Sequence, residues 1–252
     1  MKWVLRLFPR TFLIRLSLIL QPFLRWYFRG NQFEDPIDGS KYRKFLPYGY
    51  GEKLRDNALC PGTLSLERHR LLWLYLNRET DFLHQPLKVL HLAPEQVFYN
   101  RFRQFKHWNY TTADLYSPLA DVKADICELP FEDNEFDLIL CNHVLEHIYD
   151  DDKAMKEIFR VLNKNGIAIL QVPIDIKSDL THEGRDLYDK EVRNKLFGQY
   201  DHLRMYGLDY FKKLKKVGFN VKNIDYLSKL TKEEVEKFSL TNAGTIPVCI
   251  KD

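Results

Sequence analysis

The chain has 252 residues, of which 45% are hydrophobic, so it can bury one sizeable core and does not have the composition of a disordered protein. Its formal net charge is +3, but residues 1–30 contain six basic residues and no acid, and subtracting these six charges leaves −3 for residues 31–252. A nucleic-acid-binding domain usually carries a basic patch on its body, so this distribution argues against a nucleic acid as partner.

The cysteines are scattered and form no C-x-x-C pair, so neither a disulfide framework nor a thiolate zinc site is indicated. A reducing cytoplasm fits this pattern best. We interpret two of them as small core residues, because they lie in apolar segments. The four cysteines are Cys60, Cys127, Cys141 and Cys249, and the two core candidates are Cys127 and Cys141.

Residues 1–30 combine many apolar side chains with repeated arginines. The longest stretch without charge, 16–24, is far shorter than the roughly 20 residues that a membrane-spanning helix needs. A secretory signal is disfavoured because Arg15 interrupts the apolar region and no small-residue cleavage site follows. We expect a basic amphipathic segment in peripheral contact with a membrane surface. Packing on the protein's own core and a transit peptide are the alternatives.

From residue 86 onward, apolar runs of strand length alternate with segments of helical spacing. Such alternation predicts an α/β fold, with a parallel sheet covered by helices on both faces. The predicted strands are 86–92, 110–115, 122–126, 135–141, 167–172, 221–226 and 245–250; the predicted helices are 95–105, 150–162 and 208–217, with turns at Asn165-Gly166 and Gly218.

Polar residues follow the predicted strands at their carboxyl ends, where ligands bind in open parallel sheets. Asp114 ends the second strand at the spacing from the first strand at which a carboxylate can accept both hydroxyl protons of a ribose. Asp125 and Ile126 follow the third strand and suit an adenine slot. An exposed strand-end acid at Asp114 and a helix cap at Asp125 are the structural alternatives.

The segment after the fourth strand contains His143-x-x-Glu146-His147, the spelling of an inverted zinc-protease motif. That motif needs a downstream acidic ligand and a helical bed, whereas here it begins directly after a buried strand, so we disfavour the protease. A second alternative is that Glu146 and His147 only fix the loop and cap a helix.

In their order along the chain, these motifs resemble the class I S-adenosylmethionine-dependent methyltransferases, specifically the type 11-like methyltransferase domain, clearly over residues 86–175. Residues 89–95 stand in the place of the family's glycine-rich first motif, 138–147 in that of the fourth-strand motif, and 161–170 in that of the turn into strand five. The resemblance implies a Rossmann-like, seven-stranded, doubly wound sheet with an antiparallel last strand, preceded here by an N-terminal helical extension.

The resemblance also implies S-adenosyl-L-methionine as cofactor. The main departure is in the first motif, where His91, Ala93 and Pro94 replace the usual acid and glycines that let the backbone approach the cofactor. The residues expected at the cofactor are His91, Ala93, Pro94, Glu95, Asp114, Asp125, Ile126 and Asn142.

A second resemblance concerns residues 31–84, which are similar to a zinc ribbon that precedes the domain in some relatives. The positions of its cysteines are here Asp35, Asp38, Cys60 and Thr63, and one thiolate cannot hold a structural zinc. We therefore expect a metal-free remnant. The predicted division is 1–30 as the amphipathic segment, 31–84 as the extension and 85–252 as the methyltransferase domain.

Methyl transfer is an in-line displacement in which positioning supplies much of the rate, and a hydroxyl acceptor benefits from a nearby base. His143, Glu146 and His147 would share one helical face. Family members often recognise their acceptors with an insertion after strand five, here from Pro173 to Tyr206. The predicted catalytic residues are His143, His147 and His202; the predicted acceptor-binding residues are Glu146, Arg204 and Tyr206.

We expect a cytoplasmic enzyme, in peripheral contact with a membrane, that methylates a small-molecule or lipid-linked acceptor at oxygen, with no metal and no nucleic acid as partner. The insertion could instead be a surface loop with local ion pairs, such as Asp201 with Arg204. The rival function is a non-catalytic cofactor-fold binding or scaffold protein at the membrane surface. A nicotinamide enzyme is disfavoured because no G-x-G-x-x-G follows the first strand. We interpret Arg68-His69-Arg70 as a solvated helix start.

Overall fold

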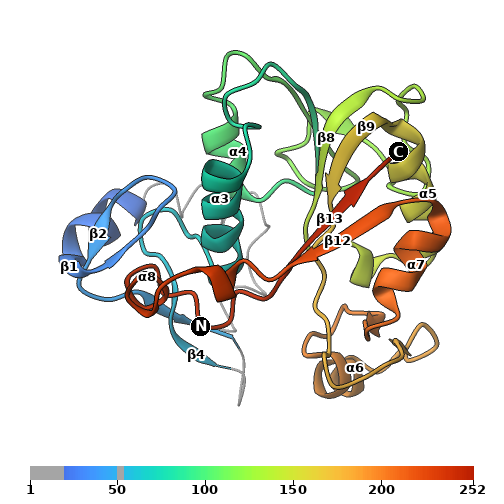
Figure 1. The fold of residues 1–252 in the computed structure, drawn as a ribbon. Helices are drawn as coiled ribbons and strands as arrows, with labels where there is room; N and C mark the ends of the chain where they lie inside the picture. The colour runs from blue at the N-terminus through green and yellow to red at the C-terminus, as the bar shows by residue number, and fades with distance from the viewer. Residues whose placement is uncertain (1–19, 50–53) are drawn as a thin grey trace. The chain divides into compact units, whose positions relative to one another are not determined.

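The computed structural model describes residues 20–49 and 54–252 (Figure 1). Most of the predicted membrane segment, residues 1–19, lies outside these ranges. The chain divides into two compact units, one formed by residues up to 81 with 226–244, and the other by 82–225 with 245–252. Residues 226–244 therefore group with the N-terminal unit, whereas the sequence placed them in the methyltransferase domain.

Among its described residues, the first unit contains two small hairpins and the helices α3 and α8. A helical segment at residues 20–27 precedes them. Tyr42, Phe45 and Cys60 are buried together and form the apolar centre of the hairpins. The elements are β1 (Arg29–Glu34) paired with β2 (Lys41–Tyr42), β3 (Leu46–Tyr48) paired with β4 (Arg55–Leu59), α3 (Glu67–Glu79), the 3-10 turn Leu227–Lys229 and α8 (Lys232–Lys237).

Arg70 explains why residues 226–244 belong to this unit. Its guanidinium is fully buried and donates to the carbonyl oxygens of Phe238 (2.7 Å) and Ser239 (2.8 Å), and also to those of Ala58 (3.1 Å) and Ser65 (2.9 Å). The interpretation of Arg68-His69-Arg70 as a solvated helix start is therefore wrong for Arg70. A buried guanidinium has enough donors to hold several chain segments at once.

The residues at the predicted ribbon positions form a hydrogen-bonded network. The fully buried carboxylate of Asp35 accepts hydrogen bonds from the hydroxyl groups of Thr63 and Ser65, the latter at 2.7 Å. The Cys60 amide donates to the Ser65 carbonyl (2.9 Å), whereas Asp38 pairs with Arg25 at 2.6 Å. These contacts give the buried carboxylate the partners that it needs away from water. The zinc-ribbon ancestry itself stays a prediction.

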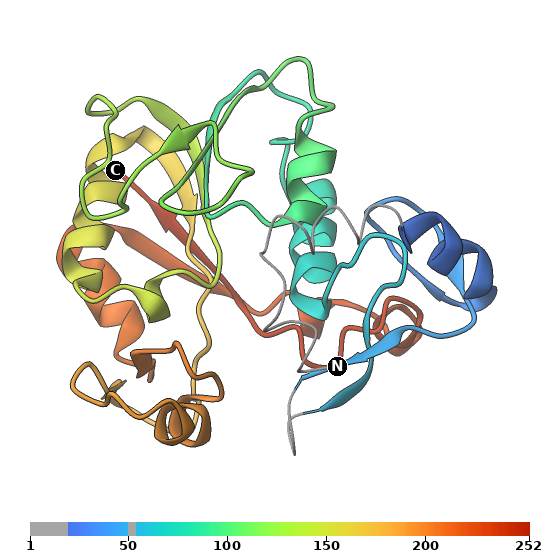
Figure 2. The same ribbon diagram turned by 180° about the vertical axis from the view of Figure 1, so that it is seen from behind.

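The second unit contains one seven-stranded sheet, which confirms the predicted Rossmann-like fold (Figure 2). All strands are parallel except β13, which is antiparallel to both of its neighbours, as the resemblance implied. The order is β12 (Asn220–Ile224), β13 (Ile246–Ile250), β9 (Leu162–Ile169), β8 (Phe136–Cys141), β5 (Lys88–Leu92), β6 (Asn109–Asp114) and β7 (Val122–Lys123).

The helices of the second unit bury their apolar sides against this sheet. The best example is α5 (Asp151–Val161), which packs against β9 and α7 (Tyr210–Val217). Asp150 caps α5 by accepting a hydrogen bond from the Lys153 amide at 2.9 Å, and acids fill its first turn, as the sequence predicted. Helix α4 (Gln96–Phe102) follows the first motif and buries Phe98 and Phe102.

An insertion separates β9 from α7 and contains α6 (Lys190–Phe197) and a two-stranded sheet, β10 (His182–Glu183) with β11 (Arg204–Met205). Figures 1 and 2 both show it at one end of the large sheet, below α7. Asp189 caps α6 at its start, and Gly198 ends it with a φ of 86°, which suits glycine. The insertion therefore has its own secondary structure at the carboxyl end of the parallel strands.

Several predicted boundaries differ from the structure; the fifth strand, for example, was predicted at 167–172 but β9 spans 162–169. Asn165-Gly166 is not a turn, because β9 runs without interruption from 162 to 169 and Asn165 takes a φ of 62° within it. The pairing with β8 shifts register at the same place, so the asparagine marks a bulge. The third predicted strand is also shorter, since β7 ends at Lys123.

Candidate active site

Strand β5, the first strand of the predicted sheet, ends at a buried chain of hydrogen bonds. The His91 ring is fully buried; its Nε2 lies 2.7 Å from Oε2 of Glu95, and its Nδ1 lies 2.7 Å from the Tyr110 hydroxyl. A carboxylate only accepts, so Nε2 donates to Glu95 and Nδ1 accepts from Tyr110 when the ring is neutral. His91 therefore positions Glu95 at the sheet edge, and its predicted contact with a cofactor stays a prediction.

Ala93 takes the backbone conformation that the missing glycine would supply. Its φ is 49°, in the left-handed region, and its amide donates to the Ala113 carbonyl at 2.9 Å. The side chain is only a methyl group, and Pro94 and Glu95 lead from it into α4. The loop thus has the tight turn of a glycine-rich motif without the glycine, a conformation compatible with close approach of a cofactor.

Asp114 ends β6 with its carboxylate partly exposed at the sheet edge. Its Oδ1 accepts hydrogen bonds from the amides of Tyr116 (2.6 Å) and Ser117 (2.5 Å). These bonds fix the orientation of the carboxylate and leave Oδ2 as the oxygen that a ribose hydroxyl could reach. Asp114 therefore fits the predicted ribose contact.

Asp125 and Ile126 follow β7 at the same edge. Asp125 is exposed, and its Oδ1 accepts a hydrogen bond from the Cys127 amide at 2.8 Å. Ile126 is 7% exposed and packs into the hydrophobic core of the unit. The backbone makes a local bridge between Asp125 and Glu128, so this is a tight loop and no helix begins there. Contact of either residue with an adenine stays a prediction.

Asn142 is the clearest sign that the sheet edge is built for a ligand. It follows β8 and is only 4% exposed, yet neither Oδ1 nor Nδ2 has a hydrogen-bond partner among the residues that the structure describes. A buried amide without partners costs free energy, so a ligand that pairs with it gains affinity. The orphaned amide, the Ala93 turn and the Asp114 carboxylate together fit a nucleoside-bearing cofactor.

Glu146 lies next along the same loop and is almost fully buried, at 1% exposure. Nδ1 of His143 lies 3.3 Å from Oε1 of Glu146. Burial raises the pKa of the Glu146 carboxyl, but the His143 and His147 imidazoles lower it by more, so its pKa lies below the ordinary value. The site therefore holds an ionised carboxylate surrounded by imidazoles.

The backbone around these residues differs from the predicted single helical face. Only Leu145–His147 form a 3-10 turn, and His143 precedes it with a φ of 54°. The His143 amide donates to the Gln171 carbonyl at 2.7 Å, which fixes that conformation. His143 and Glu146 are nevertheless brought together, as the spacing suggested.

His202 approaches Glu146 and His147 from the insertion. The rings of His147 and His202 lie edge to face with centroids 4.8 Å apart. Burial lowers the pKa of His202 below its ordinary value, so its imidazole is neutral at pH 7. The structure thus brings the three predicted catalytic histidines around one carboxylate. We call His143, Glu146, His147 and His202 the histidine–carboxylate cluster.

Arg204 and Tyr206 also come from the insertion, but they bond within the protein. Arg204 is fully buried and donates to main-chain carbonyls of residues 145, 148 and 149, and it lies 3.5 Å from the Asp151 carboxylate. The Tyr206 hydroxyl donates to Asp151 at 2.8 Å. Arg204 makes these contacts in place of the ion pair with Asp201 that the alternative interpretation offered. The predicted roles of Arg204 and Tyr206 in acceptor binding stay predictions.

Three residues that the sequence prediction did not single out support this site. Tyr110 orients His91, Gln171 fixes His143 through its carbonyl, and Asp151 holds Arg204 and Tyr206 in the insertion. Asp151 is 1% exposed and also pairs with Lys213 at 3.2 Å. In the sequence it is indistinguishable from the other acids in the first turn of α5, since only the folded chain brings its partners near.

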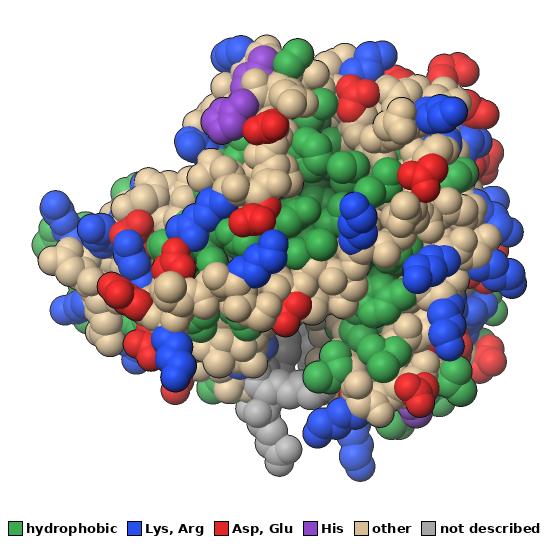
Figure 3. All heavy atoms as spheres, in the orientation of Figure 1, with side chains coloured by type: hydrophobic (Ala, Val, Ile, Leu, Met, Phe, Trp, Pro, Cys, Tyr) green, Lys and Arg blue, Asp and Glu red, His purple; other side chains and the backbone are tan. Residues whose placement is uncertain are grey.

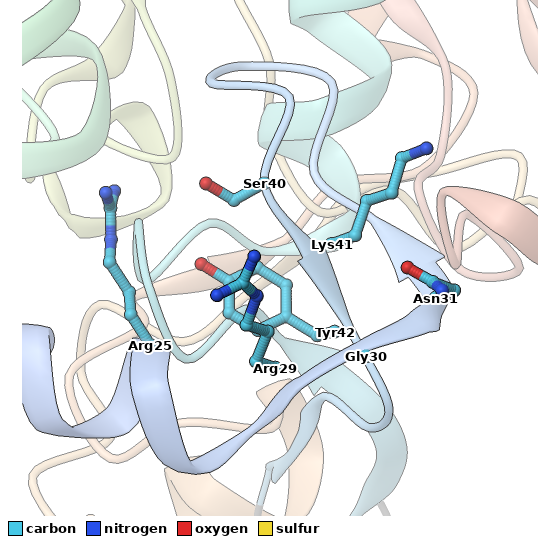
Figure 4. Close-up of a pocket in the computed structure, with 7 residues that line it drawn as sticks. All are labelled: Arg25, Arg29, Gly30, Asn31, Ser40, Lys41 and Tyr42. Carbon is cyan, nitrogen blue, oxygen red and sulfur yellow. The ribbon is translucent and has the colours of Figure 1, made fainter.

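A cavity of about 400 Å³ lies elsewhere, in the first unit (Figure 4). Its lining includes three cationic side chains, Arg25, Arg29 and Lys41, and Figure 4 shows the Arg29 guanidinium in front of the Tyr42 ring. None of the sheet-edge residues contributes to it. Its lining is polar and basic, so we treat it as separate from the candidate active site.

Comparisons with known proteins agree with this geometry. Residues 86–170 match the family model described as a methyltransferase domain. The tRNA U34 carboxymethyltransferase of Sulfurovum sp. (strain NBC37-1) is 30% identical over 176 residues, which cover 69% of this chain and 54% of that protein. The demethylmenaquinone methyltransferase of Staphylococcus carnosus (strain TM300) is 36% identical over 78 residues, or 31% of this chain and 32% of that protein.

The chain thus spans about half the length, or less, of these curated relatives. Among solved structures, the crystal structure of the cyclase SpnF superimposes with a TM-score of 0.51 over 86% of this chain and 91% of that one, at 15% identity. This likeness supports the fold alone, which the strand order also establishes. The family match, the fold and the residues at the carboxyl ends of the strands agree: residues 86–170 belong to the methyltransferase domain family, and the second unit is a class I S-adenosylmethionine-dependent methyltransferase domain, whose cofactor is S-adenosylmethionine.

Proposed function

We propose that this chain transfers a methyl group from S-adenosylmethionine to an oxygen of a small-molecule or lipid-linked acceptor. The observation that carries the proposal is the loop after β8. It begins with the orphaned amide of Asn142 and, four residues later, places the ionised carboxylate of Glu146 among imidazoles. A cofactor-facing group and an acid–base group are thus adjacent on one short segment.

On the cofactor side, the Ala93 turn, Asp114 and Asn142 would hold the nucleoside part. S-adenosylmethionine, when bound, supplies a methyl group on a positively charged sulfur, which makes that carbon open to in-line attack. The protein's remaining task is to orient the acceptor and to take up its proton.

On the acceptor side, His143 would take the proton of an attacking hydroxyl. Glu146 lies 3.3 Å behind its Nδ1, and a buried carboxylate there stabilises the imidazolium that forms. Both members are held by the fold, since the His143 backbone is fixed by Gln171 and Glu146 is almost fully buried.

The relatives do not fix the acceptor, because their names specify a tRNA position and a quinone precursor, among others. The charge pattern favours a small acceptor. On the face drawn in Figure 3, cationic and anionic side chains are interspersed, without the continuous basic surface that RNA binding requires.

The test is calorimetric titration of S-adenosylmethionine into the full chain and into Asn142→Ala. We expect saturable binding that weakens about 5- to 10-fold in the variant, the equivalent of one lost hydrogen bond. Asn223→Ala, which truncates an exposed asparagine on β12, is the matched control and should bind like the wild type. Absence of saturable binding to the wild-type chain would defeat the proposal.

An acceptor screen then separates an enzyme from the rival scaffold function. Formation of S-adenosylhomocysteine with hydroxyl-bearing acceptors, followed by mass spectrometry, would support methyl transfer at oxygen. Binding of the cofactor without turnover on any acceptor class would favour the non-catalytic alternative. Turnover only with amine or carbon acceptors would refute the oxygen assignment and keep the enzyme.

We also propose that the first unit contacts an anionic membrane surface. In the helical segment 20–27, Phe23, Trp26 and Tyr27 are exposed at 58%, 72% and 51%. Aromatic side chains next to basic ones are typical of interfacial segments, and Arg25 and Arg29 come from the same stretch. Within the described residues, no helix is long and apolar enough to cross a membrane.

Sedimentation with vesicles tests this contact. The full-length double variant Phe23→Ser, Trp26→Ser should sediment less than wild type with phosphatidylserine-containing vesicles. A control double variant, Tyr116→Ser with Tyr188→Ser, removes two aromatics that are each 86% exposed in the second unit, and should sediment normally. Equal sedimentation of all three proteins would rule out the proposed contact.

A further inference from the structure

Three side chains of the histidine–carboxylate cluster converge on one point. Glu146 and His147 come from the 3-10 turn after β8, and His202 comes from the loop after α6. The carboxylate of Glu146 and the two rings each offer a donor atom, and these atoms all lie within 4.8 Å of one another. Donor atoms that converge in this way need hydrogen-bonding partners or a cation.

Both imidazoles are anchored through the same nitrogen. Nδ1 of His147 lies 3.2 Å from the carbonyl oxygen of Asp201, and Nδ1 of His202 lies 3.1 Å from that of Phe197. A carbonyl oxygen only accepts, so in a neutral ring each Nδ1 carries the proton and each Nε2 keeps its lone pair. Metal-binding histidines are commonly oriented by this kind of second contact.

His202 and Glu146 also have buried atoms that could bind a metal and that lack hydrogen bonds. Nε2 of His202 and both carboxylate oxygens of Glu146 are buried without a hydrogen-bond partner among the described residues. His143 approaches Oε1 of Glu146 at 3.3 Å, and a carboxylate oxygen of Glu146 lies within 4.8 Å of a ring nitrogen of each of the two other imidazoles. A buried carboxylate with so few partners is costly unless a cation neutralises it.

We propose that Glu146, His147 and His202 bind a divalent transition-metal ion of the zinc class. Two neutral imidazoles and one carboxylate are the donor set of open zinc sites, which keep a fourth position for water or substrate. His147, with its side chain 31% exposed, places that position at the protein surface. In a tetrahedral zinc site the ligand atoms lie about 3.3 Å apart, so closure from 4.8 Å needs only side-chain rotation.

This site differs from the inverted protease motif that the sequence spells. The motif would use His143 and His147 as ligands and Glu146 as base, whereas the structure turns Glu146 toward His147 and adds His202 from the insertion. The sequence alone does not suggest this site, because His202 lies far downstream of the other two residues.

The role that we assign to the ion rests on the proposed function: at its open position it would bind the acceptor hydroxyl and lower the pKa of that hydroxyl. The hydroxyl proton would pass to His143, and the acceptor oxygen would then form its bond to the methyl carbon while the carbon–sulfur bond breaks. Binding of the metal does not depend on this role.

The test begins with the full chain stripped of metal by a chelator and titrated with zinc chloride alone. We expect one equivalent to bind. His202→Asn and Glu146→Gln should weaken binding by about 100-fold or more, because each removes a ligand. His182→Asn, an exposed histidine of the same insertion, is the matched control and should bind like wild type.

Two measurements keep the result clear if a variant folds poorly. Cobalt chloride added to the stripped wild-type chain should give the visible absorption of four-coordinate cobalt, and zinc should abolish it. Titration of S-adenosylmethionine into the same samples reports the cofactor side separately. Zinc binding without cofactor binding would defeat the proposed function and keep the metal site. Intact cofactor binding without stoichiometric zinc, or zinc binding unchanged in His202→Asn, would overturn the site.

Discussion

Replacing Arg204 with methionine should destabilise the second unit strongly, because the arginine holds the insertion onto the loop after β8. Its guanidinium is fully buried and donates to three main-chain carbonyls, at 2.5–3.2 Å, while the buried Asp151 carboxylate lies 3.5 Å away. Methionine fills similar volume but removes the guanidinium from the three carbonyls and from the carboxylate, which keeps Tyr206 and Lys213 as partners. Breaking a buried ion pair by removing one partner costs about 3–5 kcal/mol.

The contact of Arg204 with Glu183 adds little to this figure, because the Glu183 side chain is 36% exposed and water screens it. A loss of about 4 kcal/mol corresponds to a fall in melting temperature of roughly 8–16 °C for a chain of this size. Urea unfolding followed by circular dichroism measures the free-energy change directly. Arg204→Lys should lie between wild type and Arg204→Met, since one ammonium group keeps the charge but not the fork of donors.

Arg185→Met is the matched control, because Arg185 also pairs with Glu183, at 2.9 Å, but is 35% exposed. It should cost less than about 1 kcal/mol. If Arg204→Met proved no more destabilising than Arg185→Met, the structural role would be refuted. An unchanged stability together with a raised KM for an anionic acceptor would instead support the predicted role of Arg204 in acceptor binding.

Two further stability predictions concern the first unit. Asp35→Ala should lower the free energy of unfolding by about 2–4 kcal/mol, because it leaves the hydroxyl groups of Thr63 and Ser65 without their buried acceptor; a change below 1 kcal/mol in urea unfolding would contradict this. Arg70→Met should cost about 3–5 kcal/mol and expose residues 226–244 to limited proteolysis, since four main-chain carbonyls lose their donor. An unchanged cleavage pattern would argue against the anchoring role.

The sheet could be predicted because its strands are short apolar runs separated by helical segments, and this pattern is local in the sequence. The same holds for the residues that follow strands directly, such as Asp114 and Asn142, because the end of a parallel strand fixes their place at the sheet edge. The hydrogen-bond partners of the residues at the strand ends could not be predicted in this way. Nothing in the sequence near His91 shows that Tyr110 and Glu95 would occupy both ring nitrogens.

Long-range pairing accounts for most of what the sequence could not provide. His202 reaches Glu146 only because the insertion folds back across the end of the sheet, and periodicity carries no information on that path. Arg70 and Arg204 were expected at the surface or at a ligand, since arginine is seldom fully buried. Each is buried because its guanidinium donates to several main-chain carbonyls that the fold brings around it.

Ala93 stands where the family's first motif has a glycine, and substitutions at this position test whether the loop still needs the glycine-like backbone conformation. Since alanine in the left-handed region costs about 1 kcal/mol relative to glycine, Ala93→Gly should leave stability unchanged or slightly raised, after the greater flexibility of the unfolded chain is included. Ala93→Val should be less stable than Ala93→Gly by at least about 2 kcal/mol, because a β-branched side chain fits positive φ poorly. Thermal unfolding and S-adenosylmethionine titration measure both effects.

Ala113→Gly is the control for this pair, because Ala113 lies in β6, opposite the Ala93 amide, and is not among the residues with positive φ. Glycine there should cost about 0.5–1 kcal/mol, the opposite tendency to Ala93→Gly. If Ala93→Gly were as destabilising as Ala113→Gly, the loop would not need a glycine-like turn. If Ala93→Gly keeps stability and cofactor affinity, the first motif has kept its backbone conformation although it has lost its glycines. Alanine at position 93 is then a tolerated replacement for glycine.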